Sequence, residues 1–149
     1  MQDAAIACRQ GTVRWVKGKL DLAIQRFTEA IQLDPEYARA YCNRGTVYYE
    51  QGDLQRAMAD FTEAIRLDAN YARALNNRGL VHRRLGELEQ AVVDYSKAIQ
   101  ADPEYADAYN NRAVVYDRLH DRAKAEADYA RCQQIRSRRQ RRGLPAGEG

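Results

Sequence analysis

Apolar and small residues follow one another at helical spacing, in runs that are separated by short polar breaks. Between residues 38 and 71 the first run predicts one helix. A second run, from Leu54 to Leu67, has its apolar residues at i, i+3, i+4 and i+7 and predicts another. Gly52 lies in the break, where glycine can adopt the left-handed angle that ends a helix, and Asp53 is suited to cap the next helix. This stretch therefore predicts two helices joined by a tight turn.

The same pair of helices is written four times along the chain. The phrase Asn-Arg-Gly at residues 43–45 returns at 77–79 and, as Asn-Arg-Ala, at 111–113, each time 34 residues further on. A period of about 34 residues marks a solenoid of helix pairs. We therefore predict four repeats, at residues 4–37, 38–71, 72–105 and 106–142. The last repeat carries an extended basic helix, and residues 143–149 are expected to form a disordered tail.

Small and aromatic residues occupy fixed places in each repeat. The eighth position is always small: Gly11, Gly45, Gly79 and Ala113. The twentieth is always alanine: Ala23, Ala57, Ala91 and Ala125. A ring stands at the twenty-fourth: Phe27, Phe61, Tyr95 and Tyr129. We expect the small residues to let two helices approach closely while the ring fills the space beside them.

In these positions the chain resembles the tetratricopeptide repeat (TPR) family, particularly its bacterial members. The resemblance covers residues 4–137, and its departures are the replacement of proline by Ala69 and Ser137, of alanine by Cys132, and of the turn glycine by His120. It implies an all-α fold, a right-handed α-solenoid of four helix–turn–helix repeats. It also implies a protein-interaction scaffold that is not an enzyme and needs no cofactor.

A charged pair replaces the leucine that the family usually has at the seventh position. Three repeats have arginine there and aspartate at the twenty-third: Arg44 with Asp60, Arg78 with Asp94, and Arg112 with Asp128. The first repeat lacks both, with Gln10 and Arg26 in their places. We predict that each arginine pairs with its aspartate across the two helices.

The outer faces of the array are expected to be solvated. In the last repeat, apolar positions of the earlier repeats become Arg122, Glu126 and Gln133, and in the first repeat a ring position becomes Arg14. Terminal repeats need a polar outer face because no neighbour covers it. We therefore expect four repeats only, in a monomer.

In this family the first helices of the repeats line a concave groove, and an asparagine column lies on them here. An amide offers the donor and the acceptor that the backbone of an extended peptide requires. The alternative is that these amides bond to neighbouring helices. The arginines of this groove, Arg39, Arg73, Arg83 and Arg84, favour an acidic or carboxylate-bearing segment, unless they pair with Glu50 or Asp107. The predicted peptide-binding residues are Asn43, Asn77, Asn111, Arg39, Arg73, Asn76, Asn110 and Tyr49.

Co-chaperones of the family grip a carboxyl-terminal carboxylate with Lys, Asn, Asn, Lys and Arg at five groove positions. The same positions here hold Cys8, Thr12, Asn43, Arg73 and Asn77. Only Asn43 and Arg73 fit that pattern, so a chaperone-tail clamp is not expected.

The arginine-rich end is the second candidate for function. Net charge is +3, but residues 131–149 hold six arginines and one glutamate. Nucleic acid is the alternative partner, through phosphate contacts of Arg136, Arg138, Arg139, Arg141 and Arg142. No aromatics interleave with these arginines, and a solubilising cap remains the other interpretation. Because apolar periodicity ends at Ile135, we expect the end of this helix to pack on nothing.

Other chemistry is not indicated. Cys8, Cys42 and Cys132 fit neither a metal site nor an even disulfide framework, and Cys8 and Cys42 lie on neighbouring helices too far apart to be bridged. No apolar stretch reaches the roughly 18 residues needed to span a bilayer, and no secretory signal is visible. A reducing cytoplasm is the expected compartment. The two histidines, His82 and His120, take packing or turn positions, so no catalytic or metal site is predicted.

Overall fold

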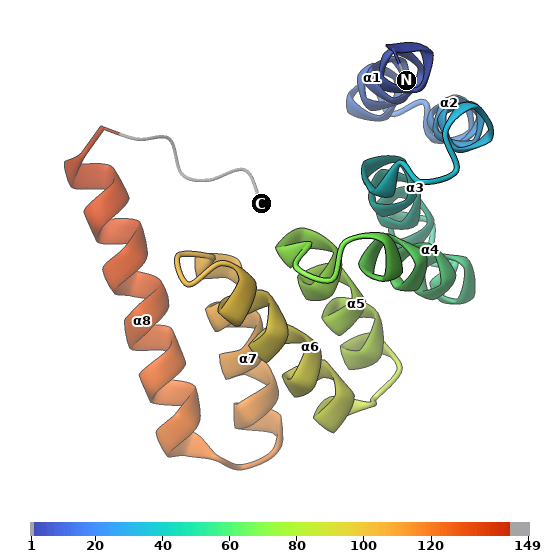
Figure 1. Ribbon diagram of the computed structural model, residues 1–149. Helices are drawn as coiled ribbons and strands as arrows, with labels where there is room; N and C mark the ends of the chain where they lie inside the picture. The colour runs from blue at the N-terminus through green and yellow to red at the C-terminus, as the bar shows by residue number, and fades with distance from the viewer. Residues whose placement is uncertain (1, 144–149) are drawn as a thin grey trace. The chain divides into compact units, whose positions relative to one another are not determined.

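The computed structural model describes residues 2–143, and over this range the chain folds into eight α-helices and no strands (Figure 1). The helices are α1 (Gln2–Val16), α2 (Leu20–Leu33), α3 (Ala38–Glu50), α4 (Leu54–Leu67), α5 (Ala72–Arg84), α6 (Leu88–Ala101), α7 (Ala106–Arg118) and α8 (Arg122–Arg141). The all-α fold of helix–turn–helix repeats predicted from the sequence is confirmed. The predicted disordered tail lies, beyond Gly143, outside the described residues.

The chain divides into two compact units, Met1–Ala74 and Leu75–Gly149. In the first unit α1 packs on α2, α2 on α3, and α3 on α4. In the second unit α6 packs on α7, and α7 on α8. Within each unit these helices pack on their sequence neighbours, as helix pairs in a repeat array do.

The turns inside the repeats have the predicted geometry. Gly18, Gly52 and Gly86 have φ angles of 71°, 80° and 77°. At the equivalent place in the last repeat, His120 adopts the same left-handed region with φ 61°. Asp53 caps α4 by accepting a hydrogen bond from the Arg56 amide at 3.1 Å. Turn glycine and capping aspartate thus end one helix and start the next.

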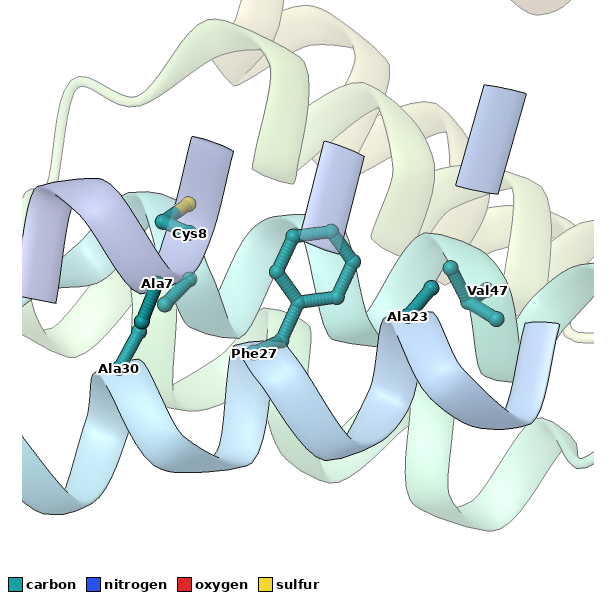
Figure 2. Packing of buried hydrophobic residues seen from close by; sticks show 7 residues of the cluster. Ala7, Cys8, Ala23, Phe27, Ala30 and Val47 are labelled. Carbon is teal, nitrogen blue, oxygen red and sulfur yellow. The ribbon is translucent and has the colours of Figure 1, made fainter. Parts of the chain in front are cut away.

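The close helix approach predicted from the small residues is confirmed. A methyl group added at Gly11 would lie 2.6 Å from a ring carbon of Phe27, and one at Gly79 would lie 2.6 Å from the ring of Tyr95. Figure 2 shows Phe27 on α2 between Ala23 and Ala30, inside the core of the first unit. Both rings are fully buried, so glycine at the eighth position makes room for the ring.

The last repeat departs from this arrangement. Its eighth residue is Ala113, which has a methyl group where the other repeats have none. Its ring, Tyr129, is only half-buried, and the hydroxyl donates to Asp117 Oδ2 at 2.9 Å. The tyrosine hydroxyl therefore reaches a carboxylate near the end of α7.

The three predicted arginine–aspartate pairs are confirmed. Each guanidinium donates two hydrogen bonds to its carboxylate, at 2.7–2.8 Å: Arg44 with Asp60, Arg78 with Asp94, and Arg112 with Asp128. Two of the arginines also reach the preceding repeat. Arg44 donates to Thr28 at 3.1 Å and Arg112 to Ser96 at 3.0 Å. Such a guanidinium joins three helices, and its charge is neutralised inside the protein.

Candidate functional site

The predicted peptide-binding residues all lie on the first helices of repeats two to four, α3, α5 and α7. They fall into two groups. Arg39, Asn43, Tyr49 and Arg73 belong to the first compact unit, and Asn76, Asn77, Asn110 and Asn111 to the second. Each group is described in its own unit.

Asn43 stands at the centre of the first group and is almost completely buried. Its Nδ2 donates to Cys8 Sγ on α1 at 3.6 Å, and its Oδ1 accepts a hydrogen bond from Arg73 Nη2 on α5. The amide therefore uses both its donor and its acceptor inside the protein. The interpretation that these amides bond to neighbouring helices describes Asn43 well.

Arg73 lacks the compensation that the structural arginines have. Its Nη2 also donates to the Tyr71 hydroxyl at 3.3 Å, and its guanidinium carbon lies 5.9 Å from the centroid of that ring. Its Nε is buried without a hydrogen-bond partner. Within residues 2–143, neither Arg73 nor the exposed Arg39 forms an ion pair with a carboxylate. These two arginines are uncompensated cations on α3 and α5.

The acidic residues suggested from the sequence as their partners are engaged elsewhere. Glu50 accepts a hydrogen bond from Trp15 Nε1 at 2.8 Å, and Asp107 pairs with Arg136 at 3.0 Å. The alternative in which Glu50 or Asp107 neutralises Arg39 and Arg73 is therefore wrong.

The polar groups around Arg73 remain uncharged. Burial raises the pKa of the Cys8 thiol, although nearby Arg39 and Arg73 act in the opposite direction, and burial also raises the pKa of Cys42. Burial raises the pKa of Tyr71 to about 12. All three cysteines are free and buried, as expected for the pair Cys8 and Cys42. At neutral pH, the cation of Arg73 is not balanced by a thiolate or phenolate.

The second group is a chain of amides. Asn111 Nδ2 on α7 donates to Asn76 Oδ1 on α5 at 3.0 Å, and Asn76 Nδ2 donates to Asn77 Oδ1 at 3.5 Å. Asn76 is buried, while Asn77, Asn110 and Asn111 are half-buried. The half-buried amides of α5 and α7 keep part of their surface available to solvent.

A regularity that sequence reasoning missed connects the two groups. In both units an asparagine at the sixth position of a repeat donates to the fifth residue of the repeat before it, 35 residues upstream: Asn43 to Cys8, and Asn111 to Asn76. The signal was present in the sequence, because a hydrogen-bond acceptor precedes each of these asparagines at that spacing. The column therefore also contributes to packing between repeats.

The arginine-rich end of α8 is not unpacked, so that expectation is wrong. Ile135 is fully buried beside Ala106 and Tyr109. Beyond it, three arginines return to the start of α7 and the loop before it. Arg136 pairs with Asp107 at 3.0 Å, Arg138 with Glu104 at 3.1 Å, and Arg139 donates to the Glu104 carbonyl oxygen at 3.0 Å. Of the five arginines predicted to bind nucleic acid, two thus pair with carboxylates and a third is bonded to a backbone carbonyl oxygen.

Helix pairs with glycine turns, small residues at the helix crossings and one ring per repeat define a helical-repeat protein. Sequence profiles identify the family of helical-repeat proteins to which the chain belongs. A profile described as TPR repeat matches residues 16–52, 45–86 and 81–119, and one described as Tetratricopeptide repeat matches residues 106–138. The chain belongs to the tetratricopeptide repeat family. No curated protein sequence matches it. Among the described residues, no helix has the length and apolar character needed to cross a bilayer.

Solved structures of the same fold are numerous, and three illustrate the likeness. The crystal structure of MamA has a TM-score of 0.84 at 24% identity, covering 93% of this chain and 81% of that one. A tetratricopeptide repeat protein from Parabacteroides merdae has a TM-score of 0.78 at 26% identity, covering 92% and 55%. The first TPR of Spaghetti (RPAP3), solved bound to the HSP90 peptide SRMEEVD, has a TM-score of 0.77 at 27% identity, covering 80% and 94%.

Proposed function

We propose that this chain is a protein-interaction scaffold that binds an extended, acidic peptide segment along the first helices of its repeats. Arg39 and Arg73 attract the carboxylates of the segment. The half-buried amides of Asn77, Asn110 and Asn111 bond to its backbone, because an amide supplies both a donor and an acceptor. Asn43 and Asn76 hold Arg73 and Asn111 in position, and Tyr49 adds a half-buried ring on α3.

One observation carries this proposal: Arg39 and Arg73 have no carboxylate partner, although the arginines at the seventh position of repeats two to four all have one. A half-buried guanidinium with an unbonded Nε costs free energy unless an acceptor satisfies it. A carboxylate is the acceptor that a guanidinium binds best, through two parallel hydrogen bonds.

The structure of the first TPR of Spaghetti (RPAP3) adds support. It covers 80% of this chain at 27% identity and holds a peptide, SRMEEVD, whose seven residues include three acidic ones. The pattern of a chaperone-tail clamp is matched here only by Asn43 and Arg73, so we do not propose the same peptide as the ligand. We propose its general chemistry, an extended acidic segment.

Nucleic acid binding through α8 is the alternative, and it has fewer free cations than the sequence suggested. Arg136, Arg138 and Arg139 are engaged with Glu104 and Asp107, which leaves Arg141 and Arg142. Phosphate binding by Arg136 or Arg138 therefore requires its ion pair to open.

The test is an array of extended acidic peptides, in which each peptide is paired with a copy that has glutamine for every glutamate. The purified chain should bind the acidic member of a pair at least tenfold more tightly. Arg39→Ala/Arg73→Ala should abolish that preference. Asn77→Ala/Asn111→Ala should weaken binding to both members, because the lost contacts are to the peptide backbone. Arg118→Ala, at an exposed arginine near the end of α7, is the matched control and should bind like the parent.

Three results distinguish the alternatives, once circular dichroism has shown equal helicity. Equal binding of the acidic and glutamine peptides would overturn the proposal. The proposal would also be overturned if neither Arg39→Ala nor Arg39→Ala/Arg73→Ala changed the affinity for acidic peptides. Binding of an RNA or DNA oligonucleotide that falls steeply with salt, and that disappears without residues 136–149, would instead assign the function to the tail.

A further inference from the structure

The first repeat exposes a surface that the later repeats bury. In repeats two to four, the third and tenth residues of the first helix are fully buried: Ala40, Ala74 and Ala108 at the third, and Val47, Val81 and Val115 at the tenth. The equivalent residues of α1 are Ile6 and Val13, whose exposures are 47% and 48%. At these two positions the outer face of α1 is therefore exposed but apolar, which the sequence did not predict.

The element that covers this surface in later repeats is a helix. In the first unit α2 packs on α3, and in the second unit α6 packs on α7. The side-chain bonds are also equivalent, because Arg44 reaches Thr28 on α2 and Arg112 reaches Ser96 on α6. The corresponding face of α1 thus offers a packing surface for one more helix, and no described helix occupies it.

The residues around this packing surface are basic. A hollow over Ile6 and Val13 is lined by Arg14, Lys17 and Arg26, among others, and a neighbouring hollow shares Arg14 and Arg26 and adds the exposed Leu22. The first repeat has Arg26 where the later repeats have an aspartate. Arg26 pairs with Glu29 at the surface, while Arg14 and Lys17 form no ion pair within residues 2–143. An apolar floor with unpaired cations around it favours an occupant with an apolar stripe and acidic flanks.

A second copy of the chain does not offer that chemistry. The outer face of α8 is polar, with Arg122 and Glu126 exposed by 88% and 64% and paired to each other. Packing α8 of one copy on α1 of another would bury those charges on an apolar floor. Packing two α1 faces together would bring their basic rims into contact, and like charges repel.

We propose that the exposed face of α1, with Ile6 and Val13 as its floor and Arg14, Lys17 and Arg26 as its rim, docks an amphipathic helix of a partner protein. The helix has apolar residues at i, i+3 or i+4 and i+7, flanked by glutamate or aspartate. It takes the place that α2 has on α3 and α6 has on α7. This surface uses the third, tenth and eleventh positions of the first repeat on α1, with Lys17 after α1 and Arg26 on α2, whereas the proposed peptide site uses other positions of α3, α5 and α7.

The probe is a stapled helical peptide that copies α6, Leu88–Ala101, with Lys97→Glu to make it acidic. The staple is needed because a free helix of this length is marginal in water. Fluorescence anisotropy of the labelled peptide should show saturable binding to the full chain. Ile6→Glu/Val13→Glu should weaken it at least tenfold, as should Arg14→Glu/Lys17→Glu. The peptide with the natural Lys97 should bind several-fold more weakly.

Both double variants replace side chains that are exposed or, for Arg14, half-buried, so they should fold, and their circular dichroism and thermal unfolding are measured first. The matched control is Leu33→Glu/Val93→Glu, at two other exposed apolar residues, and it should bind the probe like the parent. Equal affinity of the parent and Ile6→Glu/Val13→Glu would overturn the proposal. A dimer that only this variant abolishes in sedimentation would assign the face to a second copy. Absence of probe binding, with binding to phosphatidylserine vesicles that needs the same residues, would assign it to a membrane surface.

Discussion

A single left-handed residue ends the first helix of each repeat, and only the last repeat uses a residue other than glycine. His120 has φ 61°, and a side chain in this region costs about 1–2 kcal/mol, which is partly offset because glycine loses more backbone entropy on folding. We therefore predict that His120→Gly stabilises the protein by roughly 0.5–1 kcal/mol. Urea unfolding monitored by circular dichroism measures the change.

The reciprocal substitution is the control for this prediction. Gly86 has φ 77°, and a Cβ added there meets no atom within 4 Å. Gly86→His therefore tests the backbone angle without a steric clash, and it should destabilise by about 1 kcal/mol. If His120→Gly lowers the free energy of unfolding, the histidine side chain contributes more than its backbone angle costs.

Tyr71 gives the protein an alkaline pH dependence. Burial raises its pKa from 10.0 to about 12, so the folded state keeps the neutral phenol where the unfolded chain ionises. The stability that Tyr71 contributes is complete below the ordinary pKa of 10.0 and is lost as pH rises toward 12. Tyr71→Phe cannot ionise, so its free energy of unfolding should fall less steeply across this range.

Urea midpoints of parent and Tyr71→Phe, compared at several pH values between 9 and 12, test this expectation. Cys8 and Cys42 also ionise at alkaline pH, and Cys42 interacts with the Tyr71 phenol, so both chains are compared in a Cys42→Ala background, in which the difference between the two curves reports the phenol. Parallel curves would show that Tyr71 ionises equally in the folded and unfolded states.

At the scale of the helix pair, the contact between glycine and ring controls how closely two helices approach. A methyl at Gly79 would lie 2.6 Å from the Tyr95 ring, whereas glycine-to-alanine changes in open helices are favourable by about 1 kcal/mol. Because buried overpacking costs roughly 1–3 kcal/mol, we predict that Gly79→Ala destabilises the protein. Thermal unfolding shows whether Gly79→Ala lowers or raises the stability. A decrease indicates the clash with the ring, and an increase indicates the gain in helix propensity.

A second variant identifies the ring as the cause. In a Tyr95→Leu background the ring that the added methyl group would strike is absent, so Gly79→Ala should cost much less there than it does in the parent. The double-mutant cycle measures this coupling. Independent, additive effects would mean that the backbone of α5 moves away from α6 at no cost.

Packing rules that act through fixed positions were predictable from the sequence. The turn glycines, the close approach at Gly11 and Gly79, and the pairing of Arg78 with Asp94 follow from residue types that vary together among repeats. The hydrogen bonds of Asn43 were not predictable, because an amide suits either a peptide or a neighbouring helix. The return of Arg138 to Glu104 was missed because a long side chain reaches a partner outside any helical periodicity.

At the scale of the whole molecule, the two ends of the array have opposite chemistry. The outer face of α8 carries Arg122 and Glu126, paired and exposed, whereas α1 exposes Ile6 and Val13 within a basic rim. The proposed peptide site adds uncompensated cations on α3 and α5. On α8, in contrast, Glu104 pairs with Arg131 and Arg138, and Asp107 pairs with Arg136, so two carboxylates compensate part of the arginine charge. The net charge of the chain therefore does not locate a binding surface. The unpaired arginines indicate where an acidic partner is favoured.

Stability in such a chain should be local, because each repeat contacts only its neighbours. Phe61 is fully buried between α3 and α4, and Ile135 is fully buried on α8. Phe61→Leu should cost roughly 1–2 kcal/mol and Ile135→Val about 0.5–1.5 kcal/mol. Native-state amide hydrogen exchange should show the loss of protection centred on α3 and α4 for the first substitution and on α7 and α8 for the second. Because unfolding of one repeat exposes the next, protection should decline with distance from the substitution. Equal loss in all helices for both substitutions would show that the eight described helices unfold as one cooperative unit.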